Sequence, residues 1–222
     1  MSFALRLTED RLGPGSRLAL PPTPRVLYTR NGATRIESRP PTAQAGLADP
    51  ATTNAAWHGV GEVVVAADAP AVVLRFELIA AGKADERESS QSRRLLEHPI
   101  DLDPARAWLM RCDRVDFAPG GVALPHGHKG GGIRCLLAGT LEVTVGDRPP
   151  RLMLPGDAWF ESGREPVLAK ASPETPTTFV RVSILPREIR GQSSIVYVDP
   201  ADAGRGRPRQ YTVYVDEPIS LP

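Results

Sequence analysis

The two halves of this chain carry the same short motifs in the same order, and this internal repeat constrains the fold more than any other feature. Chance supplies one or two such matches in a chain rich in proline and glycine, but five collinear matches indicate a duplication. We therefore predict two related domains, residues 1–103 and 104–222. The matched segments are 14–21 with 119–125, 25–36 with 132–143, 56–61 with 158–163, 73–78 with 179–184, and 97–102 with 216–221.

The runs between the turns favour β-strands over helices. The chain has 23 prolines and 20 glycines, and short stretches of β-branched and aromatic residues lie between them, as in 61–67, 71–79 and 178–185. Long amphipathic helical periodicity is absent from the sequence. The fold class expected is all-β, with two antiparallel barrels. The repeated Pro-Ile-x-Leu segments at 99–102 and 218–221 are predicted to be strands, each pairing with the other half of the chain.

Composition excludes several classes of partner. With 27 basic and 26 acidic side chains the net charge is +1, so no global field favours nucleic acid or an anionic membrane. The basic run at 205–209 is interpreted as a solvated loop, since it lacks interleaved aromatic residues. No secretory signal or spanning segment is evident, and Cys112 and Cys135 read as buried free thiols. These features predict a cytoplasmic protein.

The residues with most chemical information are His126 and His128. Separated by one residue, they lie on the same face of a strand, because strand side chains alternate with period two. Both imidazoles can then address one cation. Arg134 shares their parity and in a regular strand points into the same barrel. The glycines at 130–132 can shift that parity through a bulge, which would send Arg134 to solvent or to a structural partner.

These residues resemble the cupin superfamily, including quercetinase-like and anti-sigma-factor-like barrels. Its first motif, G-x5-H-x-H-x3-4-E-x6-G, is matched by Gly120, His126, His128 and Gly139, and the segment 154–161 resembles its Pro-Gly-Asp-aromatic strand entry. The resemblance covers about residues 107–186 directly and about 5–80 only through the repeat. It implies a bicupin: two cupin-like antiparallel jelly-roll barrels, of which the first is degenerate.

The departures from the family pattern matter as much as the matches. Gly132 stands where the family has its glutamate ligand, and Pro166 and Val167 stand where its third histidine is expected. Two histidines alone hold a metal poorly. The resemblance therefore implies, at most, zinc, iron, nickel or manganese held weakly by His126 and His128, with Glu161 as a candidate carboxylate donor. Arg134 would convert the pocket toward an anion site, suited to a carboxylate-bearing ligand.

Three functions stay open on the sequence. The first is a small-molecule-binding cupin with a degenerate metal site, whose pocket is lined by His126, His128, Arg134 and Glu161 and holds water or a small carboxylate. The second is a metal-dependent dioxygenase or isomerase acting on a small carbonyl or aromatic compound. The third is a sensory or scaffold module without chemistry. The first barrel is expected to be inert, with an apolar interior, and the protein to be a monomer or a homodimer.

Overall fold

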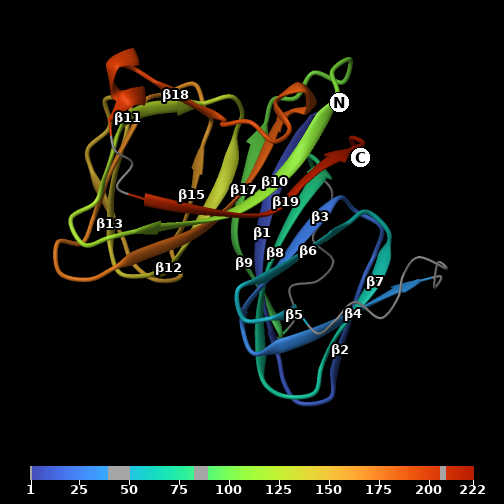
Figure 1. Ribbon diagram of the computed structural model, residues 1–222. Helices are drawn as coiled ribbons and strands as arrows, with labels where there is room; N and C mark the ends of the chain where they lie inside the picture. Colours follow the sequence, from blue (N-terminus) through green and yellow to red (C-terminus); the bar gives the residue numbers. More distant parts are fainter. Residues whose placement is uncertain (1, 40–50, 83–89, 206–208) are drawn as a thin grey trace. The chain divides into compact units, whose positions relative to one another are not determined.

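A computed structural model describes residues 2–39, 51–82, 90–205 and 209–222. The chain divides into two compact units, Met1–Pro104 with Ser220–Pro222, and Ala105–Ile219. Each unit is built of antiparallel sheets (Figure 1), and every pairing between described strands is antiparallel. Within the described residues, no helix has the length and apolar character needed to cross a membrane. The expected all-β class with two barrels is confirmed.

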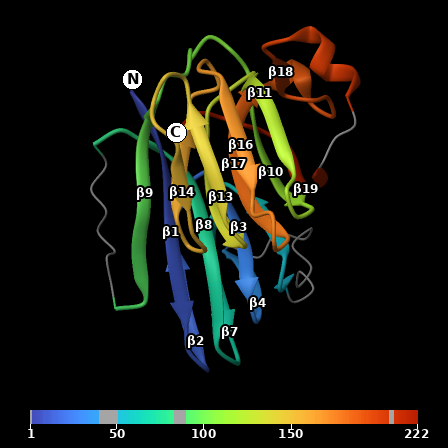
Figure 2. The ribbon, with the colours of Figure 1, turned by 90° about the vertical axis from the view of Figure 1, so that its left-hand side faces the viewer.

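The N-terminal unit pairs a five-stranded sheet, in the order β6-β3-β8-β1-β9, with a four-stranded sheet in the order β2-β7-β4-β5. Figure 2 shows β9, β1 and β8 running side by side. Its strands are β1 (Phe3–Leu12), β2 (Ser16–Leu20), β3 (Arg25–Asn31), β4 (Ala33–Arg39), β5 (Ala51–Thr52), β6 (Ala55–Gly59), β7 (Glu62–Ala67), β8 (Ala71–Ala80) and β9 (Ser92–Ile100).

The C-terminal unit repeats this plan with sheets in the orders β15-β12-β17-β10-β19 and β14-β13-β16-β11-β18. Two short 3-10 helices, η1 (Arg187–Ile189) and η2 (Pro200–Gly204), flank the added strand β18 (Ile195–Tyr197). The other strands are β10 (Trp108–Phe117), β11 (Val122–His128), β12 (Gly132–Ala138), β13 (Leu141–Val145), β14 (Arg151–Met153), β15 (Ala158–Glu161), β16 (Val167–Ala171), β17 (Thr177–Pro186) and β19 (Arg209–Ile219).

The duplication extends to the register of single residues. In the first five-stranded sheet Trp57 pairs with Leu27, which pairs with Arg75. In the second, Trp159 pairs with Arg134, which pairs with Arg181. The equivalence predicted for the two tryptophans and for the two arginines is therefore confirmed. Irregularities in strand register also recur at equivalent places. The shift at Leu7/Thr8 in β1 matches that at Cys112/Asp113 in β10, and the shift at Thr29/Asn31 in β3 matches that at Leu136/Ala138 in β12.

Two equivalent glycines show why the repeat is kept in the turns. Gly32 and Gly139 both have positive φ, 78° and 73°. A Cβ at either residue would lie 2.5 Å from a backbone carbonyl oxygen, that of Pro70 or of Pro176. Only glycine fits this conformation and this close approach. The same local constraint thus fixes the strand β3–β4 turn and the β12–β13 turn.

The prediction that the Pro-Ile-x-Leu strands pair with the opposite half is wrong. Strand β9, which ends at Ile100, pairs with β1, and β19, which ends at Ile219, pairs with β10. Each strand extends the sheet of its own unit. The edges of β1 and β10 are covered by strands of the same compact unit, so neither barrel needs a strand from the other half to close its sheet.

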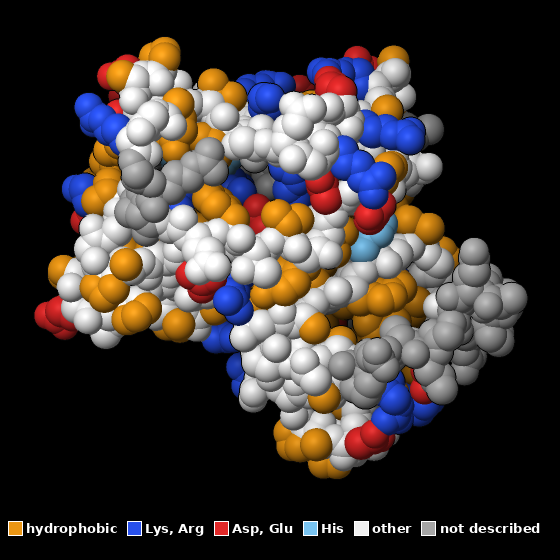
Figure 3. All heavy atoms as spheres, in the orientation of Figure 1, with side chains coloured by type: hydrophobic (Ala, Val, Ile, Leu, Met, Phe, Trp, Pro, Cys, Tyr) orange, Lys and Arg blue, Asp and Glu red, His pale blue; other side chains and the backbone are white. Residues whose placement is uncertain are grey.

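Each barrel has an apolar cluster between its two sheets. The N-terminal cluster includes Leu12, Leu27, Val65 and Val73, and the C-terminal cluster includes Val115, Leu136, Trp159 and Phe179 among its members. Both cysteines are buried and free, as expected. On the face in Figure 3, basic and acidic side chains of described residues lie interspersed, in keeping with the near-zero net charge.

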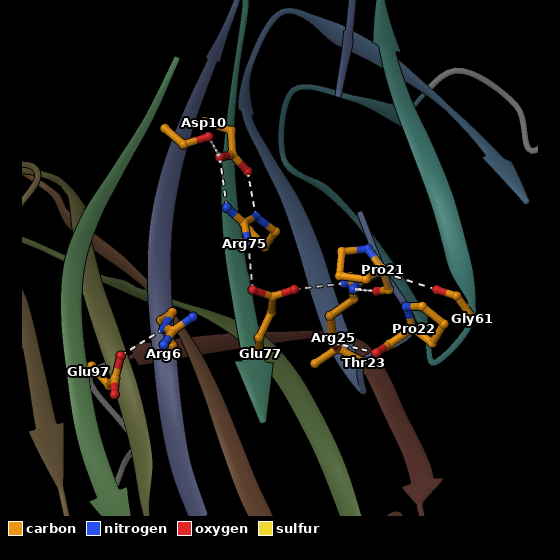
Figure 4. A network of polar contacts seen from close by, with 11 residues as sticks. Arg6, Asp10, Pro21, Pro22, Thr23, Arg25, Gly61, Arg75, Glu77 and Glu97 are labelled. Atoms are coloured by element: carbon orange, nitrogen blue, oxygen red, sulfur yellow. Dashed lines mark hydrogen bonds and ion pairs between the residues drawn. The ribbon is translucent and has the colours of Figure 1, made fainter. Parts of the chain in front are cut away.

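The N-terminal interior is not wholly apolar, and that expectation is wrong. This barrel also contains a connected network of buried charged side chains (Figure 4). Arg75 donates to Asp10 at 2.8 and 3.1 Å and to Glu77 at 2.5 Å, and Arg25 Nε donates to Glu77 at 3.1 Å. Arg25 also donates to the Gly61 and Pro21 carbonyls, and Ser92 to Asp10. Two cations and two anions close a neutral network.

Candidate functional site

The four residues singled out in the sequence meet in the C-terminal barrel. His126 and His128 on β11, Arg134 on β12 and Glu161 on β15 line one cavity. All four side chains are buried; Arg134, at 1% exposed, is the most enclosed. Arg134 therefore points into the barrel, as strand parity predicts. The cavity measures about 20 Å³, room for about one water molecule.

Glu161 contacts three other side chains of this cluster. Arg134 Nη2 lies 2.7 Å from its Oε2, Trp159 Nε1 donates to its Oε1 at 2.8 Å, and His128 Nε2 lies 3.4 Å from Oε2. Burial alone would raise the pKa of Glu161, but Arg134, His128 and Trp159 together hold that pKa well below its usual range. Burial lowers the pKa of Arg134 to about 10, so the guanidinium stays charged near neutral pH. The buried pair is thus ionised.

The two imidazoles are neutral. Their ring centroids lie 4.9 Å apart at an interplanar angle of 89°. His126 Nδ1 donates to the Leu124 carbonyl at 2.7 Å, which leaves Nε2 as the acceptor nitrogen. Burial lowers the pKa of His126, and lowers that of His128 to about 3. Neither ring adds positive charge to the cavity near neutral pH.

A larger cavity of about 340 Å³ adjoins this inner one. Arg181 and Tyr211 line both. Asp113 accepts two hydrogen bonds from Arg181, at 2.7 and 2.8 Å, and Asp216 accepts two from Arg111, at 2.8 and 3.0 Å. The segment 191–195, which follows η1 and ends at the first residue of β18, forms another wall. We call this space the outer cavity and the space beside the histidines the inner cavity.

Comparison with known proteins rests on structure. No protein-family model matches the sequence, and none of the curated proteins matches it. Among solved structures, a mutant of oxalate decarboxylase OxdC from Bacillus subtilis matches with a TM-score of 0.64 at 12% identity, covering 91% of this chain and 73% of that one. AerE from Microcystis aeruginosa matches with a TM-score of 0.60 at 11% identity, covering 82% and 88%.

A third match names the fold. A cupin 2 conserved barrel domain protein from Leptotrichia buccalis has a TM-score of 0.51 at 12% identity, covering 82% of this chain and 88% of that one. The chain has the cupin fold, present twice. At these identities the likeness concerns the fold, so the chemistry of the C-terminal cupin barrel must be argued from its own residues.

The side chains of this cupin barrel do not fit a resident divalent cation. A Cβ at Gly132, the position of the family glutamate, would lie 2.5 Å from the Val182 carbonyl oxygen and 2.6 Å from Ser183 Oγ. Val167, where a histidine is expected, pairs with His126 across the sheet. Arg134 is bound to Glu161, the one carboxylate among the described residues that line the inner cavity. Among the described residues, no group of three His, Cys, Asp or Glu side chains could hold a metal ion.

Sequence reasoning missed part of this cupin site. Arg209 was assigned to a solvated loop, yet it opens strand β19, is only 9% exposed and lines the inner cavity. Arg205 is exposed as expected, while 206–208 lie outside the described residues. Tyr211 lies two residues after Arg209, so the two side chains point to the same face of a strand. The strand-like pattern of residues 209–213 is the sequence signal that could have placed Arg209 in the barrel. Arg181 was noted only as a repeat match, although its parity with Phe179 places it in the barrel.

Proposed function

We propose that the C-terminal cupin barrel binds a small organic molecule in the outer cavity and holds no resident metal. The observation that carries this proposal is the 340 Å³ outer cavity, which shares Arg181 and Tyr211 with the inner cavity that the histidines line. Its volume falls within the range of about 300–1,000 Å³ typical of small-molecule sites. The inner cavity admits only the tip of such a ligand.

The walls of the outer cavity support a preorganised binding site. The Arg181–Asp113 and Arg111–Asp216 pairs are each bidentate, which fixes the planes of both guanidinium groups. Arg111 also donates to the Gln192 and Ile189 carbonyls, which ties the 189–192 segment to the barrel. A ligand entering this space would meet groups already held in place, so little side-chain entropy is lost on binding.

The Arg134–Glu161 pair supports the absence of a metal. In an ordinary metal site the carboxylate oxygen would face the cation, whereas here Glu161 Oε2 faces a guanidinium at 2.7 Å. Any cation that recruited Glu161 would have to displace this charge and leave Arg134 buried without its partner. An unpaired buried charge is strongly unfavourable.

A second candidate function is a metal-dependent cupin enzyme. The observation that favours it is the adjacency of His128 to Glu161 and to His126, three donor groups that would converge if Arg134 moved away. Two structural neighbours are named oxalate decarboxylase and salicylate 1,2-dioxygenase; the latter has a TM-score of 0.53 at 13% identity. Near-stoichiometric metal in protein purified without chelator would favour this candidate.

Soaking crystals with a library of small organic fragments tests the binding proposal. We expect bound fragments beside Arg181 and Tyr211. Val213 lines the outer cavity and is 56% exposed, so Val213→Trp should fill the entrance and abolish binding without disturbing the core. Val198 is 60% exposed and lies outside that lining, so Val198→Trp is the matched control. Fragment binding that survives Val213→Trp, or that occurs only elsewhere, would contradict the proposal.

A further inference from the structure

Among the described residues of the C-terminal unit, one buried guanidinium has no carboxylate of its own. Arg111 pairs with Asp216, Arg134 with Glu161 and Arg181 with Asp113. Arg209 is 9% exposed and, among the described residues, forms no ion pair. Its Nε donates to the Tyr211 hydroxyl, and its guanidinium carbon lies 5.6 Å from the centre of the Tyr211 ring. These contacts orient Arg209 without neutralising it.

The charges at the inner cavity leave an excess of one positive unit. Among the described residues, Arg134, Arg181 and Arg209 line this cavity. They face two anions, Glu161 in the lining and Asp113 bound to Arg181. The imidazoles are neutral and do not change this balance. A buried unpaired cation is unfavourable unless a counter-ion reaches it.

A free donor marks where the counter-ion would bind. Arg209 Nη2 is buried and has no hydrogen-bond partner among the residues that the structure describes. The residue lies on the wall of the inner cavity, next to Tyr211, which also lines the outer cavity. Water can satisfy the hydrogen bond but cannot offset the charge, whereas one carboxylate oxygen does both.

We propose that the ligand of the C-terminal barrel is a monocarboxylate whose carboxylate group pairs with Arg209. One oxygen occupies the inner cavity, which has room for about one water molecule, and the organic body lies in the outer cavity between Tyr211 and Arg181. This inference rests on the proposed function, because it requires the outer cavity to bind a small molecule. It moves the anion contact from Arg134, which Glu161 already neutralises, to Arg209.

Isothermal titration of the full chain with matched acids and amides tests this inference. The probes are formate, acetate and benzoate, each compared with formamide, acetamide or benzamide, which have nearly the same shape and no charge. We expect at least one acid to bind about tenfold or more tightly than its amide, as befits a charge-assisted hydrogen bond. Arg209→Gln should reduce acid affinity to the level of the amide, and Arg209→Lys should retain part of it.

Arg205→Gln is the matched control, since it removes the same charge from the same run but at a side chain that is 64% exposed and paired with Asp202. It should leave acid affinity unchanged. Equal affinity for acids and amides in the wild type would overturn the carboxylate inference and leave the binding proposal standing. If neither class binds, both proposals fail. The wild-type ratio needs no variant, so a folding defect in Arg209→Gln would not obscure the result.

Discussion

Each barrel buries an arginine on an equivalent strand, β3 or β12, but among the described residues only the C-terminal barrel leaves a buried charge unpaired. Arg25 on β3 is wholly buried and closes a neutral network with Glu77, Arg75 and Asp10. Arg134 on β12 is 1% exposed and pairs with Glu161, beside two neutral imidazoles. The N-terminal network ends on backbone carbonyls, whereas the C-terminal cluster borders two cavities.

Under the proposed function, this difference means that one copy of the fold uses its buried charges for stability and the other for binding. A buried polar network that satisfies all its members specifies structure and needs no ligand. A cluster with one cation in excess, next to a cavity of small-molecule size, is the feature on which the binding proposal rests. In the C-terminal barrel, the Arg134–Glu161 pair lies beside the two histidines to which the family resemblance assigns a metal.

The largest expected effect is on stability, in a comparison of substitutions at Arg75 and Arg181, which occupy equivalent register positions. Arg75 contacts two buried carboxylates and Arg181 contacts one. Arg75→Met should lower the free energy of unfolding by about 3–5 kcal/mol, because it leaves Asp10 buried without its partner. Arg181→Met should lower the free energy of unfolding by a smaller amount. Urea denaturation of both variants measures this, and an equal or reversed order would break the proposed contrast.

The next largest difference between the barrels is expected in the pH dependence of stability, because both buried imidazoles belong to the C-terminal barrel. Burial lowers the pKa of His128 from 6.5 to about 3, so the unfolded chain binds a proton more readily between these values. Stability contributed by neutral His128 is complete above pH 6.5 and falls as the pH drops through this window, by at most about 1.4 kcal/mol per pH unit.

Unfolding midpoints between pH 7 and pH 4 check this slope. His128→Asn should flatten it, and His98→Asn, which alters an exposed imidazole on β9, should leave it in place. A slope that is the same in all three proteins would show that His128 is not buried in the neutral form.

A smaller effect is expected at the paired tryptophans. Trp159 is 4% exposed and donates to the ionised Glu161, while its equivalent Trp57 is half-buried. Trp159→Phe should destabilise the protein by about 1–3 kcal/mol, because a buried carboxylate loses a hydrogen bond. Trp57→Phe should cost less. Thermal unfolding of the two variants compares them, and a larger loss at Trp57 would contradict the roles assigned here.

The fold was predictable because the internal repeat and the strand periodicity can both be recognised directly in the sequence. The matches at Trp57 and Trp159 and at Arg75 and Arg181 proved to be equivalent to the residue in the sheets. Parity also placed Arg134 in the same cavity as His126 and His128. These inferences need only the alternation of side chains along a strand.

The partners of buried charges were not predictable, because they depend on contacts distant in sequence. Arg25 meets Glu77 across 52 residues, and Arg75 meets Asp10 across 65. Nothing in the local pattern of β3 indicates that Arg25 lies inside. Arg209 was obscured for a related reason: its neighbours in the run 205–209 are typical of a loop, and only the strand that follows draws it into the barrel.

Metal content tests the central claim, that an internal guanidinium stands in place of a metal ion in the C-terminal barrel. Protein purified without chelator, and then equilibrated with manganese, iron, nickel or zinc and dialysed, should contain far less than one metal ion per chain. Arg134→Gln frees Glu161 beside His128 and should raise the bound metal toward one per chain, a gain that His126→Ala in the same background should abolish. Stoichiometric metal in the wild type, lost in His126→Ala, would contradict the account.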